Sequence, residues 1–288
     1  MAEHALCVAA GIAEKTGAKL TLLHVLERRP PSRVHRQRHL RGSTEAEEYL
    51  RELAGKLLPA GMGVSWHVHP EPTRITAASL GDHASEFGAD LVVMCAHGEV
   101  RLRDRLVGNV GQQLAARRAV PVLLLRTGKG QEAIFPFRRM LIPLDGLAEH
   151  EAGLAPAAAL AGICGASVEL LTVVSTLVSD RRGESPSQTY LPGTTRLILD
   201  IHQQQAADYL QAQLHRLSEG GLAASAQIAK GKPASVIASV ARKSGTDIVV
   251  LATHGRAGTN AFWAGSLPPQ LLRRLNTAFL LVPARELL

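Results

Sequence analysis

The chain has 288 residues, of which 46% are hydrophobic and 20% are charged, and its formal net charge is +7. This composition is typical of packed globular protein and excludes a chain that is disordered throughout. No apolar run approaches the ~18 residues of a membrane-spanning helix, and no basic leader precedes the first apolar stretch, so we expect neither a membrane span nor a secretory signal. At roughly 150 residues per domain, the length predicts two domains.

The three cysteines, Cys7, Cys95 and Cys164, lie far apart in apolar surroundings. An odd and scattered set gives neither a disulfide framework nor the ligand spacing of a zinc site. We therefore expect buried thiols in a reducing cytoplasm.

Most of the net positive charge comes from one segment, residues 28–44, which contains six arginines and no acidic residue. The chain has only ten Phe, Tyr and Trp residues, which is few for a base-stacking surface, so nucleic acid is not the expected partner. Two prolines and the lack of apolar periodicity favour a solvated loop over residues 28–41. Binding of a phosphate-rich partner or a membrane surface is the alternative.

A repeat with a period of about 150 residues divides the chain. The stretch GAKLTLLHV (17–25) matches GASVELLTV (165–173), and ADLVVMCAHG (89–98) matches TDIVVLATHG (246–255). Each pair is followed by a helix-like segment and a closing strand, at 107–126 and 264–283. Two blocks that match in the same order indicate a duplicated domain, which we place at 1–128 and 137–288.

The first copy begins with a helix near Met1, and no strand precedes that helix. Either its sheet lacks the first strand, so that the strands on both sides of that position would lose hydrogen bonds, or the true start of the chain lies upstream of Met1. The second copy reads as strands alternating with helices, which predicts an α/β domain with a parallel sheet. Its expected strands are 140–145, 167–174, 223–229, 247–252 and 278–283, and its expected helices are 148–164, 195–218, 234–244 and 266–275.

Three strand ends of the second copy carry the candidate site, because ligands of open parallel sheets bind outside the carboxyl ends of the strands. Asp145 follows the first strand and could accept hydrogen bonds from hydroxyls or an exocyclic amine. Gly265-Ser266 opens a late helix, whose free N–H groups favour phosphate. Taken singly, each of these residues has a simpler reading, as a strand end or a helix cap.

Together these residues resemble a known family, the universal stress proteins, from about Phe137 to the C-terminus. The resemblance rests on PFRRMLIPLDG, GASVELLTVV, TDIVVLATHGRAG, the AGS that follows and the closing AFLLVP. The family's nucleotide signature is Gly, two residues, Gly, nine residues, Gly, then Ser or Thr. Ala252 stands at its first Gly, while Gly255, Gly265 and Ser266 keep the spacing.

The resemblance implies a flavodoxin-like (adenine nucleotide alpha hydrolase-like) three-layer sandwich with a parallel five-stranded sheet, duplicated in this chain. It also implies a site for ATP or AMP, with or without Mg²⁺. The implied site residues surround the adenosine or hold the phosphates; they are Pro143, Leu144, Asp145, Val173, Leu251, Ala252, His254, Gly255, Arg256, Gly265, Ser266 and Leu267.

The first copy keeps less of the signature. Cys95 stands at the first Gly and Asn109 replaces Ser or Thr. We expect a degenerate site with a structural or partner-binding role. Its weaker counterparts of the site residues are Val25, His97, Gly98, Gly108 and Asn109.

Other residues have competing interpretations. His67 and His69 alternate on a strand; with only Glu71 near in sequence, an exposed edge strand is favoured over a metal site. His97 and His254 could touch phosphate or equally anchor a loop, and Arg256 could reach a phosphate or face solvent. The final strands, VPVLLLR and AFLLVPA, are candidate edges through which the two halves, or two chains, would associate.

No catalytic motif stands out: the chain has no G-x-S-x-G elbow, Walker lysine motif or HExxH. The leading interpretation is a cytoplasmic tandem universal stress protein, a nucleotide-binding signalling module with at most slow ATP hydrolysis and a protein partner that the sequence does not identify. An interaction scaffold without nucleotide and an adenylating enzyme of the wider nucleotide-binding α/β group are the alternatives.

Overall fold

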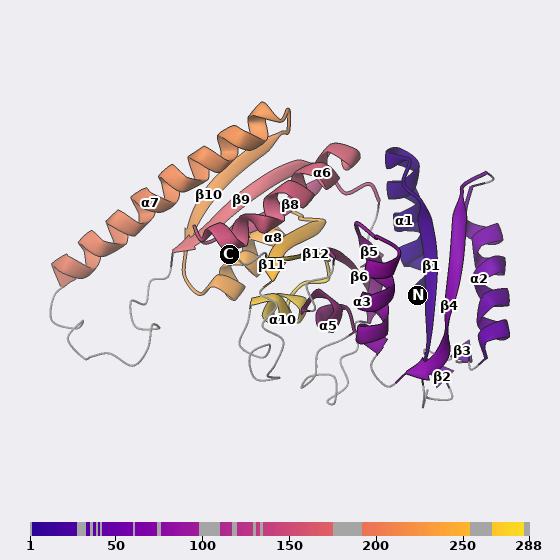
Figure 1. The fold of residues 1–288 in the computed structure, drawn as a ribbon. Coiled ribbons are helices and arrows are strands. Elements are labelled where there is room, and N and C mark those ends of the chain that lie inside the picture. The colour runs from indigo at the N-terminus through magenta and orange to yellow at the C-terminus, as the bar shows by residue number, and fades with distance from the viewer. Residues whose placement is uncertain are drawn as a thin grey trace. The chain divides into compact units, whose positions relative to one another are not determined.

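The chain divides into two compact units, residues 1–135 and the part from Pro136 onward, which are described separately (Figure 1). The structure is a computed structural model. It describes residues 2–27, 33–34, 37–38, 40, 42–59, 61–73, 76–97, 110–116, 120–128, 131–132, 135–174, 192–253 and 267–284.

The second unit contains five parallel strands joined by helices. Its strands are β8 (Arg139–Leu144), β9 (Ser167–Val174), β10 (Ala224–Lys230), β11 (Ile248–Thr253) and β12 (Ala278–Pro283). Its helices are the 3₁₀ helix η1 (Ala148–Gly153), α6 (Leu154–Cys164), α7 (Pro192–Glu219), α8 (Pro233–Lys243) and α10 (Leu267–Leu272). The strand order is β10-β9-β8-β11-β12, so β8 is the central strand.

Burial explains why these apolar runs form strands. In β8, Met140, Leu141 and Ile142 are each at most 1% exposed, and the first four residues of β11 are all buried. A strand covered by helices on both faces needs apolar residues at consecutive positions rather than at alternate ones. The predicted strands of this half, which were placed on such runs, are therefore confirmed to within one residue at each end.

Helix boundaries follow from local backbone chemistry. Helix α8 begins at Pro233, whose missing N–H would have no intrahelical partner there, and Gly245 follows the helix at φ +62°. Gly165 closes α6 in the same left-handed conformation. An added Cβ at Gly245 would lie 2.7 Å from Nη1 of Arg139, the end of a flexible side chain that can shift, so it is the positive φ that favours glycine at that turn.

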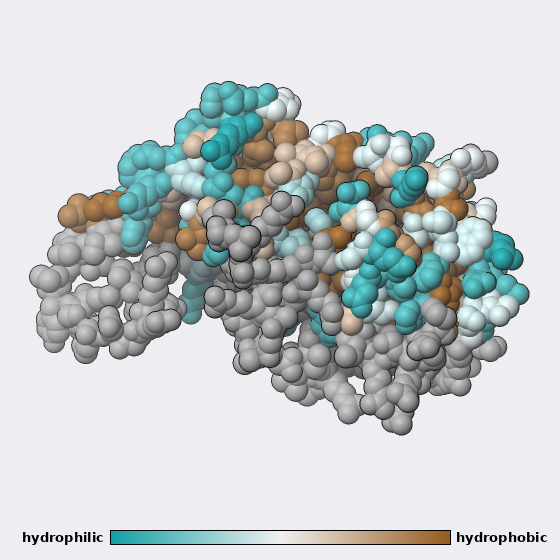
Figure 2. Space-filling model, viewed as in Figure 1, coloured by the Kyte–Doolittle hydropathy of each residue, from teal (hydrophilic) through white to brown (hydrophobic). Residues whose placement is uncertain are grey.

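Helix α7 is longer than expected and is buried over only part of its length. Leu210 and Leu217 are buried, where the helix packs against β9 and β10. Leu197 and Ile201, nearer its start, are 60% and 47% exposed. Figure 2 shows the start of this helix as a brown apolar end beside a mostly teal, hydrophilic remainder.

The first unit has fewer paired strands. Its helices are α1 (Ala2–Thr16), α2 (Ser43–Leu57), α3 (Thr76–Glu86) and α5 (Val110–Ala116). Its strands are β1 (Leu20–Glu27), β2 (Arg33–Val34), β3 (Gln37–Arg38), β4 (Val64–Thr73), β5 (Val92–His97), β6 (Val122–Gly128) and β7 (Gln131–Glu132). Within the described residues, β1 pairs in parallel with β4 alone and β5 with β6 alone.

The sheet of the first unit is therefore divided where the second unit has β8. Helix α1 contacts both β1 and β5 and lies between them (Figure 1). It does so with five buried apolar residues, Ala5, Leu6, Val8, Ala10 and Ala13. A helix cannot supply the hydrogen bonds of a sheet ladder, so among the described residues β1 and β5 are not joined through a strand between them.

The division also changes how well the neighbouring strand is covered. Residues 92–95 of β5 are all only partly buried, whereas the matching residues of β11 are buried except for Ala252. Gly11 lets α1 approach Phe135, because a Cβ there would lie 2.5 Å from the Phe135 ring. The absence of a side chain at Gly11 thus allows close packing of α1 within the first unit.

Two expectations need correction. The segment 28–41 is not wholly loop, since β2 and β3 pair antiparallel within it, with Arg33 opposite Arg38. The cysteines are not buried: Cys7 is exposed on α1, and Cys95 and Cys164 are partly exposed. Apolar neighbours in sequence do not guarantee burial, because a helix turns alternate faces to solvent. No helix among the described residues is long and apolar enough to cross a membrane.

Candidate functional site

The strand order of the second unit reverses between β8 and β11. From β8 the chain moves outward to β9 and β10, and then returns to the other side of β8 for β11 and β12. Such a reversal leaves the carboxyl ends of the two central strands without a crossover helix between them. Paired residues of β8 and β11 are confined to the amino halves, Met140 with Ile248 and Leu141 with Val249.

The structure brings the described site residues of this unit to that end of the sheet. Pro143 and Leu144 end β8, Asp145 follows it, and Val173 lies at the end of β9 opposite Ala229. Leu251 and Ala252 lie near the end of β11, and Leu267 is the first residue of α10. The remaining predicted residues, His254, Gly255, Arg256, Gly265 and Ser266, lie outside the described residues.

The described site residues differ in how far their side chains are exposed to solvent. Leu144 and Leu251 are each 4% exposed, so their side chains belong to the core and only their backbone could meet a ligand. The side chain of Asp145 is 50% exposed. The carboxylate that follows the central strand is therefore partly accessible to solvent.

Asp145 is held by two groups of the following turn. Nδ1 of His150 lies 2.7 Å from both carboxylate oxygens, and the N–H of Leu147 donates to Oδ1 at 3.1 Å. Partial burial alone would raise the pKa of Asp145, but these hydrogen bonds outweigh it and lower the pKa below its usual value. The Asp145 hydrogen bond raises the pKa of His150, against partial burial, which lowers it.

His150 is the site residue that sequence reasoning missed. The signal was present, since a histidine five residues after a strand-end aspartate falls in the first turn of the following helix. Here that turn is η1, a 3₁₀ helix, and it directs the ring back to the strand end. Gly153 closes η1, and a Cβ there would lie 3.4 Å from Val250 Cγ1, so η1 packs closely on β11.

Helix α7 supplies a second polar group beside η1. Nε2 of Gln213 donates to Glu151 at 3.0 Å, and Nη1 of Arg216 lies 3.8 Å from the same carboxylate. Burial, reinforced by Glu151, raises the pKa of Tyr209 far above its usual value. Glu151 is thus engaged by α7, while Asp145 is engaged by His150.

The first unit does not reproduce this arrangement. Val25 is buried on β1 and His97 ends β5, but no described strand lies between them to carry a counterpart of Asp145. Gly98, Gly108 and Asn109 lie outside the described residues.

The pair His67 and His69 is not on an exposed strand face, which corrects the expectation for these residues. Strand β4 is an edge strand, but both rings pack against α3. His83 Nε2 lies 2.9 Å from His69 Nδ1, His83 Nδ1 lies 3.0 Å from Glu86 Oε2, and Phe87 stacks on His83. Residues distant in sequence complete the cluster, which is why spacing alone did not reveal it. Across the described part of the chain, no three His, Cys, Asp or Glu side chains are arranged to hold a metal ion.

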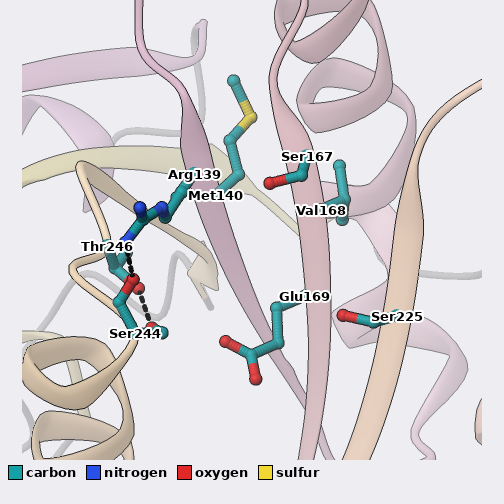
Figure 3. A pocket seen from close by; sticks show the side chains of 8 residues that line it. All are labelled: Arg139, Met140, Ser167, Val168, Glu169, Ser225, Ser244 and Thr246. Carbon is teal, nitrogen blue, oxygen red and sulfur yellow. Dashed lines mark hydrogen bonds between the residues drawn. The ribbon is translucent and has the colours of Figure 1, made fainter.

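A cavity of about 230 Å³ lies at the opposite end of the second unit's sheet (Figure 3). Its lining includes Arg139, Ser167 and Ser225 from the amino ends of three strands. Arg139 Nη1 donates to the Ser244 carbonyl at 2.5 Å, and Glu169 accepts from Gln227. The charged side chains of this cavity are engaged with their neighbours, and the switch point is at the other end, so the cavity is not the candidate site.

The fold and the strand-end site define a duplicated flavodoxin-like α/β protein with an acidic switch point in its second half. The pattern of the Universal stress protein family matches the chain twice, over residues 1–126 and 136–283. The chain belongs to the universal stress protein family. Comparison with curated proteins finds no match.

Solved structures agree on the fold. A universal stress protein from Archaeoglobus fulgidus DSM 4304 has a TM-score of 0.68 at 15% identity, over 98% of this chain and 92% of that one. A functionally unknown protein from Pseudomonas aeruginosa PAO1 has a TM-score of 0.61 at 18% identity, over 97% and 87%. At such identities the similarity concerns the fold.

Proposed function

We propose that the second unit, residues 137–288, binds an adenine nucleotide, ATP or AMP, at the switch point of its sheet. The observation that carries the proposal is the half-exposed Asp145 carboxylate at the tip of the central strand, where β8 and β11 are no longer paired. The two oxygens could accept hydrogen bonds from ribose hydroxyls or the adenine amine. The phosphates, with or without Mg²⁺, would lie at Gly255, Gly265 and Ser266, as the family signature implies.

The first unit, residues 1–128, has in this proposal a structural or partner-binding role. Among the described residues of its divided sheet, no strand carries an acidic group at the switch point. Association of the halves or of two chains through the final strands also belongs to the proposal, as does a cytoplasmic location. The bound nucleotide would bias the conformation or partner choice of the whole chain in a stress response.

Titration of ATP into the full chain tests this function. We expect saturable heat, and a 100-fold excess of ATP over Kd should stabilise the protein by about 2.7 kcal/mol in thermal unfolding. Gly265→Val should abolish both signals, because a branched side chain would block backbone approach to the phosphates.

Two results would support other functions. Absence of both heat and stabilisation with millimolar ATP or AMP would favour a nucleotide-free scaffold. Pyrophosphate release with an acceptor substrate would favour an adenylating enzyme, and we expect none.

A further inference from the structure

The carboxylate proposed to meet the nucleotide already has an internal partner. Nδ1 of His150 is 2.7 Å from each of the two Asp145 oxygens, so one imidazole N–H spans the open edge of the carboxylate. The Leu147 N–H takes a further lone pair of Oδ1. A ligand that donates to both oxygens from that edge must displace the His150 ring or move it aside.

The ring is more enclosed than the carboxylate it covers. The side chain of His150 is 23% exposed and that of Asp145 is 50% exposed. Helix η1, which carries His150, packs on β8, β11, β12 and α6. Rotation of the His150 side chain about its own bonds moves the ring away from Asp145 without a change in the sheet.

The charged groups that act on His150 are Asp145, which follows β8, and Glu149, its neighbour on η1. Glu151 lies on η1 as well, where Tyr209 and Arg216 of α7 interact with it. Glu151 is held by Gln213 and Arg216, and Glu149 adds a second negative charge that favours the imidazolium. The acidic surroundings therefore strengthen the closed pair when His150 carries a proton.

We propose that His150 is a positioning residue that acts through Asp145. Its imidazolium, bound to the carboxylate, blocks adenosine from Asp145, and loss of the imidazolium proton makes the carboxylate accessible to adenosine. This inference rests on the proposed function of the second unit. It adds a pH dependence to the proposed function: the affinity of the site for adenosine should rise with pH.

The sign follows from the charge of the pair. Below the raised pKa of His150 the ring is an imidazolium, and separating it from Asp145 costs an ion pair with a hydrogen bond. Above that pKa the neutral ring offers only a hydrogen bond, which costs less to break. Binding should therefore release a proton from His150 and strengthen as the pH rises from about 6 to about 8.

Adenosine is the appropriate probe, because it lacks the phosphate groups that titrate in the same range. In calorimetric titrations of the full chain we expect adenosine to bind roughly three- to tenfold more tightly at about pH 8 than at about pH 6. H150Q keeps a neutral hydrogen-bond donor and should remove most of the slope, that is, of the change in adenosine affinity with pH. The matched control is H215Q on the exposed pair of His215 with Glu219, which should keep the slope.

The outcomes separate the two proposals. Binding that is equally tight at both pH values, or an equal slope in wild type and H150Q, would overturn the role of His150 and leave the nucleotide site standing. No adenosine or ATP binding at either pH, in wild type and in H150Q, would overturn the proposed function and this inference together. Any slope from His254 persists in H150Q, so the difference between the slopes belongs to His150.

Discussion

Replacing Asp145 by alanine should weaken ATP binding roughly 10- to 100-fold and leave the second unit folded. The expected loss is that of hydrogen bonds to a charged acceptor, about 1.5–3 kcal/mol. The fold should persist because the side chain is half-exposed and follows β8 rather than lying within it. Its ion pair with His150 lies near the surface, where such pairs contribute about 0–1 kcal/mol to stability.

The matched control is Asp208→Ala on α7, which removes the same group from an exposed position where it accepts a hydrogen bond from Gln204. Isothermal titration of ATP into both variants, with circular dichroism of each, makes the comparison. If the Asp145 variant bound ATP as tightly as wild type does, the nucleotide would not lie at the switch point. An equal loss in both variants would show that the effect is one of net charge.

Leu141→Ala should destabilise the second unit by about 2–5 kcal/mol. Leu141 is fully buried in β8, where it pairs with Val249 on one side and Glu169 on the other. Truncation removes apolar contacts and leaves a cavity that the two neighbouring strands cannot close. Denaturant unfolding of the full chain, followed by circular dichroism, measures the loss.

Leu197→Ala is the control, because it removes the same atoms from a leucine that is 60% exposed on α7. Its expected effect is within about 0.5 kcal/mol. If Leu141→Ala were as mild as Leu197→Ala, β8 would not be the central strand on which the second unit depends.

Much of the second unit could be predicted from the sequence because its strands are buried on both faces. Such strands appear as continuous apolar runs, and 167–174 and 278–283 are observed with the predicted bounds. The divided sheet of the first unit was also predictable, since the repeat shows which strand precedes the helix in one copy and not in the other. The apolar runs can be recognised within short segments, and the divided sheet from a comparison of the two copies.

The missed features depend on packing and on local helix geometry that spacing in the sequence does not show. His83 and Glu86 join His67 and His69 only after α3 packs on β4. His150 reaches Asp145 because the first turn after β8 is a 3₁₀ helix rather than an α-helix, and periodicity does not distinguish the two. The exposure of Cys7 likewise depends on which face of α1 meets its neighbours.

Amide hydrogen exchange of the full chain, with and without saturating ATP, tests most directly whether the nucleotide lies at the second unit's switch point. The proposed site predicts slower exchange at the carboxyl ends of β8, β9 and β11, with little change at β1 and β5. Slower exchange confined to the first unit, or none anywhere at saturating ATP, would contradict it.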